Sequence, residues 1–182
     1  MKYFFPVFLF FFLSCNQEPI SIYSNIDGLN HEEILNGPET LEKHSLELIY
    51  NIDTTLSEEN FKLLIEALNK SSDELSPYYF NALTFYCKNL KINEKLELEA
   101  ALFNYFIYHP KLYISNIKKM EIQYSDCFLI TISSYIQEYL SQNEITIISM
   151  KNLAYKYCKD CSKEEIKFIY DYLDLSNNFQ KE

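Results

Sequence analysis

The sequence predicts an all-α protein, and two patterns lead to this prediction. From about Pro38 onward, apolar residues recur at helical spacing, and short polar breaks separate these segments. Residues that favour the first turn of a helix recur every 16 to 19 residues. Two helices with their turns therefore repeat about every 32 to 37 residues, the length scale of helical-hairpin repeats. Two arrangements stay open: a solenoid-like array of short antiparallel helical hairpins, and a compact helical bundle.

The predicted helices begin at residues suited to an N-terminal turn. A Ser or Asn oxygen accepts a hydrogen bond from an unpaired first-turn N–H group, and Pro has no such N–H. The spacing of Ser162 and Glu165 also fits a capping box. The predicted starts are Ser57, Ser76 before Pro77, Asn93, His109 before Pro110, Ser125, Asn143 and Ser162.

Three segments have one apolar face, which we expect to pack against the core. Residues 96–108 are apolar nearly all round, so they predict the most buried helix. We expect one helical domain over residues 31–175 and a polar tail at 176–182. The apolar faces comprise Phe61, Leu64, Ile65 and Leu68; Phe128, Ile132, Tyr135, Ile136 and Tyr139; and Met150, Leu153, Ala154 and Tyr157.

The first residues predict export from the cytosol. Lys2 is followed by an apolar run from Tyr3 to Leu13. Eleven apolar residues are too few to cross a bilayer, which needs about 20, but they suit the hydrophobic region of a secretory signal. Residues 1–14 are therefore predicted to be a signal peptide.

The end of this run, Phe12-Leu13-Ser14-Cys15, resembles the lipobox of bacterial lipoproteins. The resemblance implies cleavage between Ser14 and Cys15, with acylation of the Cys15 sulfur and of the new amino group. Phe12 departs from the Leu that is most frequent there. Two or three acyl chains anchor a protein stably, whereas one does not.

The predicted lipoprotein resides in the cell envelope. Residues 15–30 have no sustained periodicity, which predicts a lipidated N-terminus and a flexible spacer. The residue after Cys15 is Asn16 rather than the Asp that favours retention in the inner membrane of well-studied lipoproteins. We expect residence in the outer membrane, on either the periplasmic or the surface face.

Composition argues against several function classes. The net charge is −10, and removal of residues 1–14 would make it −11 because Lys2 is their only charged residue. This charge disfavours nucleic acid as a partner. There is no Arg for bidentate anion recognition, and Gly28 and Gly37 cannot build a phosphate-binding loop. We therefore expect no cofactor, no metal and no small-molecule substrate.

Four cysteines remain after lipidation of Cys15. In an exported protein Cys87, Cys127, Cys158 and Cys161 are disulfide candidates, and three complete pairings exist. Cys158 and Cys161 form a C-x-x-C motif between two predicted helices, without the strand that precedes a thioredoxin motif. The favoured interpretation is a structural disulfide at this turn or buried thiols, and Cys87 can meet Cys127 if their helices run antiparallel.

The three histidines and an acidic cluster suggest no catalytic site. His31 lacks a second His at the metalloprotease spacing, and we expect it in a solvated helix start. His44 lies among charged residues and His109 at a helix break, with no neighbouring nucleophile. The cluster of Glu94, Glu97 and Glu99 is expected to be hydrated surface, because its spacing does not build an oxygen cage.

Aromatic pairs have two interpretations. Tyr78 with Tyr79, and Tyr105 with Tyr108, can line a groove for carbohydrate or peptide, but packing at the edge of the core is the favoured interpretation. No residue is predicted to be catalytic, and the chain is not expected to be an enzyme.

The sequence favours a membrane-anchored, non-catalytic protein-interaction or scaffolding module of the envelope. The unknown partner is expected to be a protein, preferably a basic one. One alternative is an envelope immunity protein that neutralises a cationic toxin. Another is a metal-binding or thiol-redox protein that uses Cys158 and Cys161.

Overall fold

The structure is a computed structural model that describes residues 30–70, 75–119, 122–141 and 145–178. The predicted signal peptide, the lipobox with Cys15 and the spacer up to residue 29 lie outside the described residues. So does the predicted helix start at Asn143.

Within the described ranges, all regular structure is helical, so the all-α prediction is confirmed. The predicted helix break at His109 and Pro110 is present, since α5 ends and α6 begins there. The elements are α1 (His31–Asn36), α2 (Leu41–Ile49), α3 (Glu58–Lys70), α4 (Ser76–Tyr86), the 3-10 turn η1 (Cys87–Asn89), α5 (Ile92–Tyr108), α6 (Pro110–Ile117), α7 (Ile122–Ser141), α8 (Ile147–Tyr157) and α9 (Lys163–Asn178).

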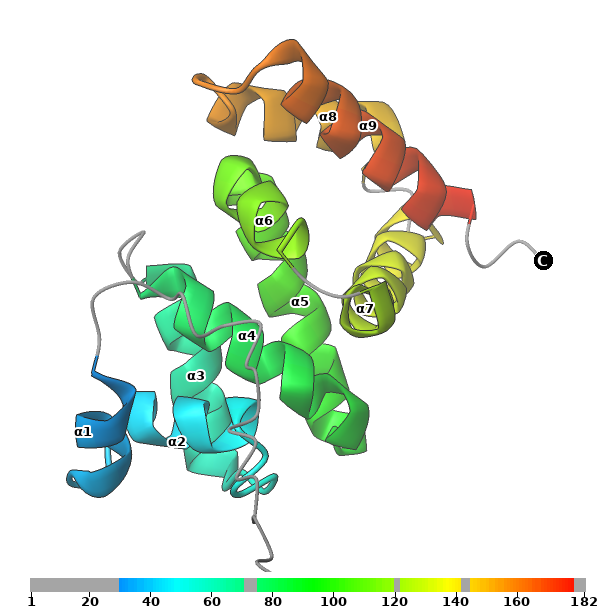
Figure 1. Ribbon diagram of the computed structural model, residues 1–182. Helices are drawn as coiled ribbons and strands as arrows, with labels where there is room; N and C mark the ends of the chain where they lie inside the picture. The colour runs from blue at the N-terminus through cyan, green and yellow to red at the C-terminus, as the bar shows by residue number, and fades with distance from the viewer. Residues whose placement is uncertain (1–29, 71–74, 120–121, 142–144, 179–182) are drawn as a thin grey trace, which may run out of the picture.

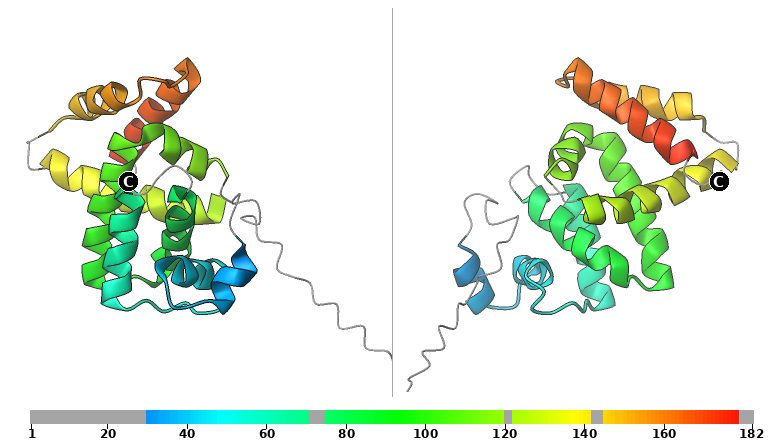
Figure 2. Two further views of the ribbon diagram at one scale, coloured as in Figure 1. Left: turned by 90° about the vertical axis from the view of Figure 1, so that its left-hand side faces the viewer. Right: turned by 45° about the vertical axis from the view of Figure 1, so that its right-hand side comes forward.

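Two central helices hold the fold together. Helix α4 packs against α2, α3, α6 and α7, and helix α5 packs against α3, α6, α7 and α8. The short α1–α2 segment lies at one end of the molecule, and the α8–α9 hairpin lies at the opposite end (Figures 1 and 2).

The packing favours the compact bundle over a regular hairpin array. In an array each repeat contacts only its neighbours. Here helices three positions apart also touch, namely α4 with α7, α5 with α8, and α6 with α9. The buried apolar residues also form one continuous core that receives side chains from α2 to α9.

Aromatic rings fill the centre of this core. The Phe80 ring of α4 makes edge contacts with Phe128 of α7 and Tyr113 of α6, at centroid distances of 4.9 and 5.6 Å. Such pairs contribute about 0.5–1.5 kcal/mol each beyond their burial. The Tyr113 and Tyr172 hydroxyls lie 2.6 Å apart and form a buried hydrogen bond between α6 and α9. The core tyrosines therefore satisfy their polar ends inside the protein.

Two predicted helix caps are confirmed. The Ser57 hydroxyl accepts from the Asn60 N–H at 3.1 Å. At Ser162 both arms of the capping box form: the Glu165 N–H donates to the Ser162 hydroxyl at 3.2 Å, and the Ser162 N–H donates to the Glu165 carboxylate at 2.7 Å. These caps satisfy N–H groups that the first turn leaves unpaired.

Other predicted starts were wrong in position or role. Ser125 lies inside α7, three residues after that helix begins. Asn93 is the second residue of α5, and the Glu94 carboxylate, rather than Asn93, accepts from the N–H of the N-cap Lys91. For α8, whose predicted start Asn143 lies outside the described residues, the N-cap is Thr146, and its hydroxyl accepts from the Ser149 N–H at 3.1 Å.

The start at Ser76 is correct in position, but this residue does not cap the helix. Ser76 is fully buried, and its hydroxyl makes a short hydrogen bond with the Tyr105 hydroxyl of α5. Tyr105 also accepts from the Asn116 side-chain amide at 3.3 Å. Ser76 therefore links α4 to α5 and α6 rather than closing its own first turn.

Two further predictions are corrected by burial. Helix α4, not residues 96–108, is the most buried, since nine of its eleven residues are buried while Leu96 is 61% exposed. The polar tail also begins too early at 176, because α9 continues to Asn178 and Ser176 is fully buried. The Gln137 side chain of α7 donates to the Ser176 and Asn177 carbonyls and so holds this last turn.

Candidate functional site

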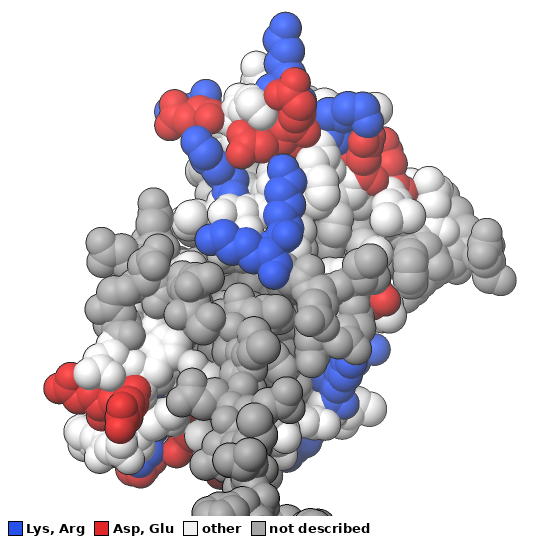
Figure 3. All heavy atoms as spheres, in the orientation of Figure 1, with Lys and Arg blue, Asp and Glu red and all other residues white. Residues whose placement is uncertain are grey.

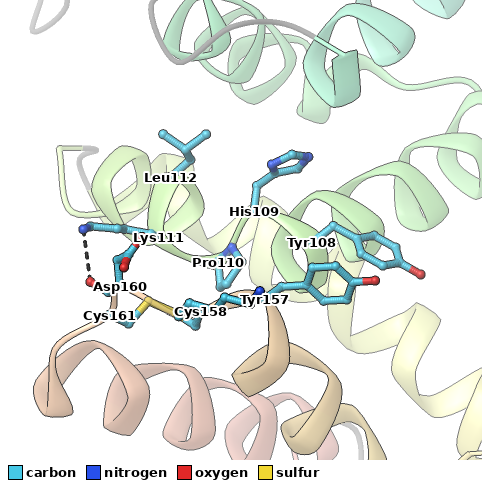
Figure 4. Close-up of a pocket in the computed structure, with 10 residues that line it drawn as sticks. Tyr108, His109, Pro110, Lys111, Leu112, Tyr157, Cys158, Asp160 and Cys161 are labelled. Atoms are coloured by element: carbon cyan, nitrogen blue, oxygen red, sulfur yellow. Dashed lines mark hydrogen bonds between the residues drawn. A yellow bond between two sulfur atoms is a disulfide. The ribbon is translucent and has the colours of Figure 1, made fainter.

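A cleft lies where the α5–α6 corner faces the α8–α9 turn. Its volume is about 300 Å³, the small end of the range for ligand pockets. Figure 4 shows its lining from both elements. The lining residues are Tyr108, His109, Pro110, Lys111, Leu112, Tyr157, Cys158, Lys159, Asp160 and Cys161.

The α5–α6 corner exists because proline cannot continue a helix. Pro110 lacks the N–H that an uninterrupted helix would need, and it serves instead as the first residue of α6. The backbone N–H of His109 still bonds to the Tyr105 carbonyl at 2.9 Å. This abrupt change of direction brings Tyr108 and Lys111 to the same cleft.

The opposite wall is the turn between α8 and α9. The structure pairs Cys158 with Cys161 as a disulfide, with 5.2 Å between the two Cα atoms, and this disulfide lines the cleft (Figure 4). The Lys111 ammonium donates to the Asp160 carbonyl at 3.2 Å and so connects the two walls. The disulfide therefore fixes one wall of the cleft, and the Lys111 hydrogen bond holds the two walls together.

Cationic and aromatic groups occupy different ends of the cleft. Lys111 and Asp160 lie at one end in Figure 4, while Tyr108 and Tyr157 lie at the other. The two tyrosine rings meet edge to face at 4.8 Å, and each tyrosine remains 44% exposed. This arrangement can bind a ligand that carries both an anionic and an apolar group.

The second cysteine pair lies outside the cleft. The structure pairs Cys87 of η1 with Cys127 of α7, at a Cα–Cα distance of 6.3 Å. The Thr131 hydroxyl lies 3.8 Å from the Cys87 sulfur. This is the pairing that the antiparallel interpretation anticipated, and it connects two segments 40 residues apart.

The C-x-x-C turn lacks the geometry of a thiol-redox motif. Cys158 follows the last residue of α8, and Cys161 precedes α9 by two residues. The turn is thus arranged as a brace between two helices.

The structure places His31 differently from the sequence interpretation. Its ring lies between the Tyr50 hydroxyl of the α2 C-cap and the Tyr78 hydroxyl of α4, at 2.6 and 2.7 Å. Burial lowers the pKa of His31 below its ordinary value. His31 does begin α1, as expected, but it is half-buried rather than solvated, because its imidazole joins α1 to Tyr50 and Tyr78.

His44 does lie among charged groups, as expected. Its ring nitrogens are 3.2 Å from the Glu47 carboxylate and 3.8 Å from the Glu39 carboxylate. Among the described residues, Glu39, His44 and Glu47 form a group whose possible metal-ligand atoms all lie within 4.8 Å of one another. The Lys43 ammonium already forms an ion pair with Glu39 at 2.6 Å, so this carboxylate has a cation partner within the chain.

The interpretation of Glu94 and Glu99 as hydrated surface was wrong, since only Glu97 of the cluster is exposed. Burial raises the pKa of Glu94, but the Lys91 N–H, the Tyr86 hydroxyl and the Lys91 ammonium outweigh it and lower the net pKa. Burial also raises the pKa of Glu99, where the Lys95 ammonium is 3.9 Å away and Glu138 lies nearby.

The tyrosine pairs follow the packing interpretation in all but one member. Tyr78, Tyr79 and Tyr105 are buried in the core, whereas Tyr108 lines the cleft. Its partner Tyr157 was assigned to an apolar face, and Lys111 drew no attention in the sequence. The Pro110 break and the C-x-x-C turn were the available signals, but nothing in the sequence indicated that they meet.

No protein-family model matches this chain, and searches of curated proteins and of solved structures also find no match. Among the described helices, none combines the length and apolar character that crossing a membrane requires.

Proposed function

We propose that this chain is a lipid-anchored envelope protein whose rigid helical body binds a partner protein. The observation that carries the proposal is that the cysteines fall into two groups, those paired in disulfides and the one in the lipobox-like segment. Four of the five, from Cys87 to Cys161, are joined in pairs in the structure, and the fifth, Cys15, ends the lipobox-like segment. Paired cysteines fit an oxidising compartment, and the remaining one is the cysteine that a lipoprotein acylates.

The architecture supports presentation of a binding surface away from the membrane. A tether that ends at residue 29 would join the body at α1, while the cleft lies at the α8–α9 end (Figure 1). A partner outside the membrane can therefore reach the cleft without contact with the lipid.

The absence of a recognisable reaction centre at the cleft favours binding over catalysis. Of the lining residues His109 is the general-base candidate, and its described ring contact is with the core residue Tyr105, at 5.5 Å. The braced walls and the half-exposed tyrosines instead suit recognition, because rigid aromatic side chains lose little conformational entropy on binding.

Two experiments test the two parts of this proposal. The variant Cys15→Ala is expected to retain its signal peptide or to leave the membrane fraction. Normal acylation and fractionation of this variant would contradict the anchoring.

For the binding part, a photo-crosslinking amino acid replaces Tyr157 in living cells and, as a matched control, Leu63 on α3, which is 46% exposed. A discrete adduct is expected from the cleft position and not from the control. Identical adduct patterns from both positions would exclude the cleft as the binding surface.

A further inference from the structure

The charge of this acidic protein is unevenly distributed. The described residues from 30 to 108 include twelve Asp or Glu and six Lys, whereas those from 109 to 178 include seven Asp or Glu and eight Lys. Figure 3 shows acidic side chains gathered at the α1 end and lysines over α6, whereas over the α8–α9 hairpin lysines lie among Asp and Glu side chains. The region around the cleft is therefore less negative than the molecule as a whole.

Lysines are concentrated at the cleft itself. Lys111 and Lys159 both line it and are exposed, and Asp160 is the one carboxylate of the lining. Lys156 lies beside the aromatic end, with its ammonium 5.7 Å from the centre of the Tyr157 ring. Hydrogen bonds with Ser162 lower the pKa of Glu165 at the start of α9, and the charges of Lys111 and Lys118 lower it further.

We propose that the cleft binds an acidic peptide segment of the partner, in which a carboxylate lies next to an aromatic or large apolar side chain. This inference rests on the proposed function and names the chemistry of its partner. It also replaces the basic partner that net charge alone favoured.

The two ends of the cleft fit the two parts of such a segment. An ammonium has three N–H donors, and the Asp160 carbonyl accepts from one donor of Lys111. A peptide carboxylate therefore binds Lys111 without breaking the contact between the walls. The apolar side chain packs on the exposed faces of Tyr108 and Tyr157, and a volume of about 300 Å³ admits one or two side chains rather than a folded domain.

A basic partner is disfavoured at this position. It would meet two lysines among the lining residues, where Asp160 is the one carboxylate, although Glu165 beside the cleft also interacts with Lys111. A nucleic acid also carries anionic groups, but its phosphate backbone extends beyond the cleft lysines, so more of its charge would face the acidic remainder of a protein of net charge −10 than that of a short acidic segment.

The test measures peptide binding to the oxidised mature chain by calorimetry or NMR titration. The probe is the capped pentapeptide EDFED, compared with QNFQN, KKFKK, EDAED and a short single-stranded oligonucleotide. We expect EDFED to bind at least about tenfold more tightly than the others, and its affinity to fall when salt rises from about 50 to about 300 mM.

Variants locate the site. Lys111→Gln and Tyr157→Ala are expected to weaken EDFED binding at least about fivefold, with unchanged circular dichroism. The control Lys62→Gln removes a lysine of α3 that pairs with Glu58, and it should bind as the original chain does.

Equal binding of EDFED and QNFQN, tighter binding of KKFKK or the oligonucleotide, or no effect of Lys111→Gln would each overturn the inference. Crosslinking at Tyr157 reports the partner without regard to its charge. A partner captured there without preference for EDFED would therefore refute the acidic peptide and leave the proposed function standing.

Discussion

Two glutamates on one helix show how the surroundings of a buried carboxylate decide whether it stabilises or destabilises the folded state. Glu94 and Glu99 of α5 are both buried, yet their carboxyl groups have opposite shifts in pKa. Glu94 accepts from the Lys91 N–H at 2.8 Å and from the Tyr86 hydroxyl at 3.0 Å. Glu99 has the Lys95 ammonium at 3.9 Å and the Glu138 carboxylate nearby.

The first prediction compares Glu94→Gln with Glu99→Gln. At neutral pH, Glu94→Gln is expected to lower the free energy of unfolding by about 1–3 kcal/mol, because it removes a charged acceptor from two donors. Glu99→Gln is expected to raise it by about 1 kcal/mol, because an ionised, desolvated carboxylate disappears. Urea unfolding of both variants measures the difference.

The pH dependence of both effects follows from linkage. The lowered pKa of Glu94 stabilises the fold above the unfolded value of 4.5, and this contribution is lost as pH falls through the folded pKa. The raised pKa of Glu99 has the reverse effect, so the gain in Glu99→Gln should vanish below pH 4.5. A change of the same sign in the free energy of unfolding of both variants at neutral pH would contradict this description of α5.

His31 gives the second prediction at this scale. Because burial lowers its pKa, the folded state favours the neutral imidazole. Its contribution to stability is present above the unfolded value of 6.5 and is lost as pH falls through the folded pKa.

The stability advantage of the original chain over His31→Gln should therefore shrink between about pH 7 and 5. The control His44→Gln leaves the hydrogen bonds of His31 to Tyr50 and Tyr78 in place, so the pH-dependent loss that His31 causes should remain in it. An advantage that is constant with pH would show that His31 does not titrate in this environment.

Such residue contacts were beyond prediction from the sequence. His31 meets partners 19 and 47 residues away, and Ser76 meets one 29 residues away. Local patterns describe the residues on either side along the chain, whereas these hydrogen bonds depend on which helix faces end up adjacent. For that reason His31, Glu94 and Glu99 were assigned to solvent.

At the scale of elements, local chemistry predicted much more. Ser57 and Ser162 mark helix starts through hydrogen bonds that close within three residues, and Pro110 marks one because it lacks the N–H that a continuing helix needs, so each signal is contained in the local sequence. The predicted start at Ser125 was wrong because serine is also accommodated inside a helix, as it is in α7, so a serine alone does not mark a helix start.

The two disulfides should differ in their effect on stability. Cys87–Cys127 closes a loop of 40 residues, whereas Cys158–Cys161 closes one of three. The loop-entropy relation gives about 4 kcal/mol for the first and about 2 kcal/mol for the second. We expect the double Ser variants to lose stability in that order, as measured by urea unfolding without reductant.

Binding should respond in the opposite order. The Cys158–Cys161 pair lines the cleft, so its Ser variant is expected to weaken EDFED binding more than the more destabilised Cys87/Cys127 variant does. Equal stability of both variants would argue against the pairing of the cysteines that the structure contains.

At the scale of the whole molecule, the all-α class was predictable and the packing was not. Periodicity reports that a helix has one apolar face, but it does not say which other face covers it. The regular spacing of helix starts suggested an array, yet contacts such as α5 with α8 close the helices into one core. The cleft depends on this closure, and therefore appeared only in the structure.

The distribution of charge also belongs to this scale. The acidic half contains α1, where the predicted tether joins the body, and its charge would hold the body away from an anionic leaflet. The lysine-bearing cleft would then face outward. Composition predicted one net charge but not the concentration of the excess acidic residues in the half that contains α1.

Intact mass spectrometry of the protein extracted from membranes, without reduction, tests the central claim most directly. The account predicts a chain that begins at Cys15, carries two or three acyl chains and has lost four hydrogens through two disulfides. A chain that still begins at Met1, without acylation and with free thiols at the other cysteines, would contradict it.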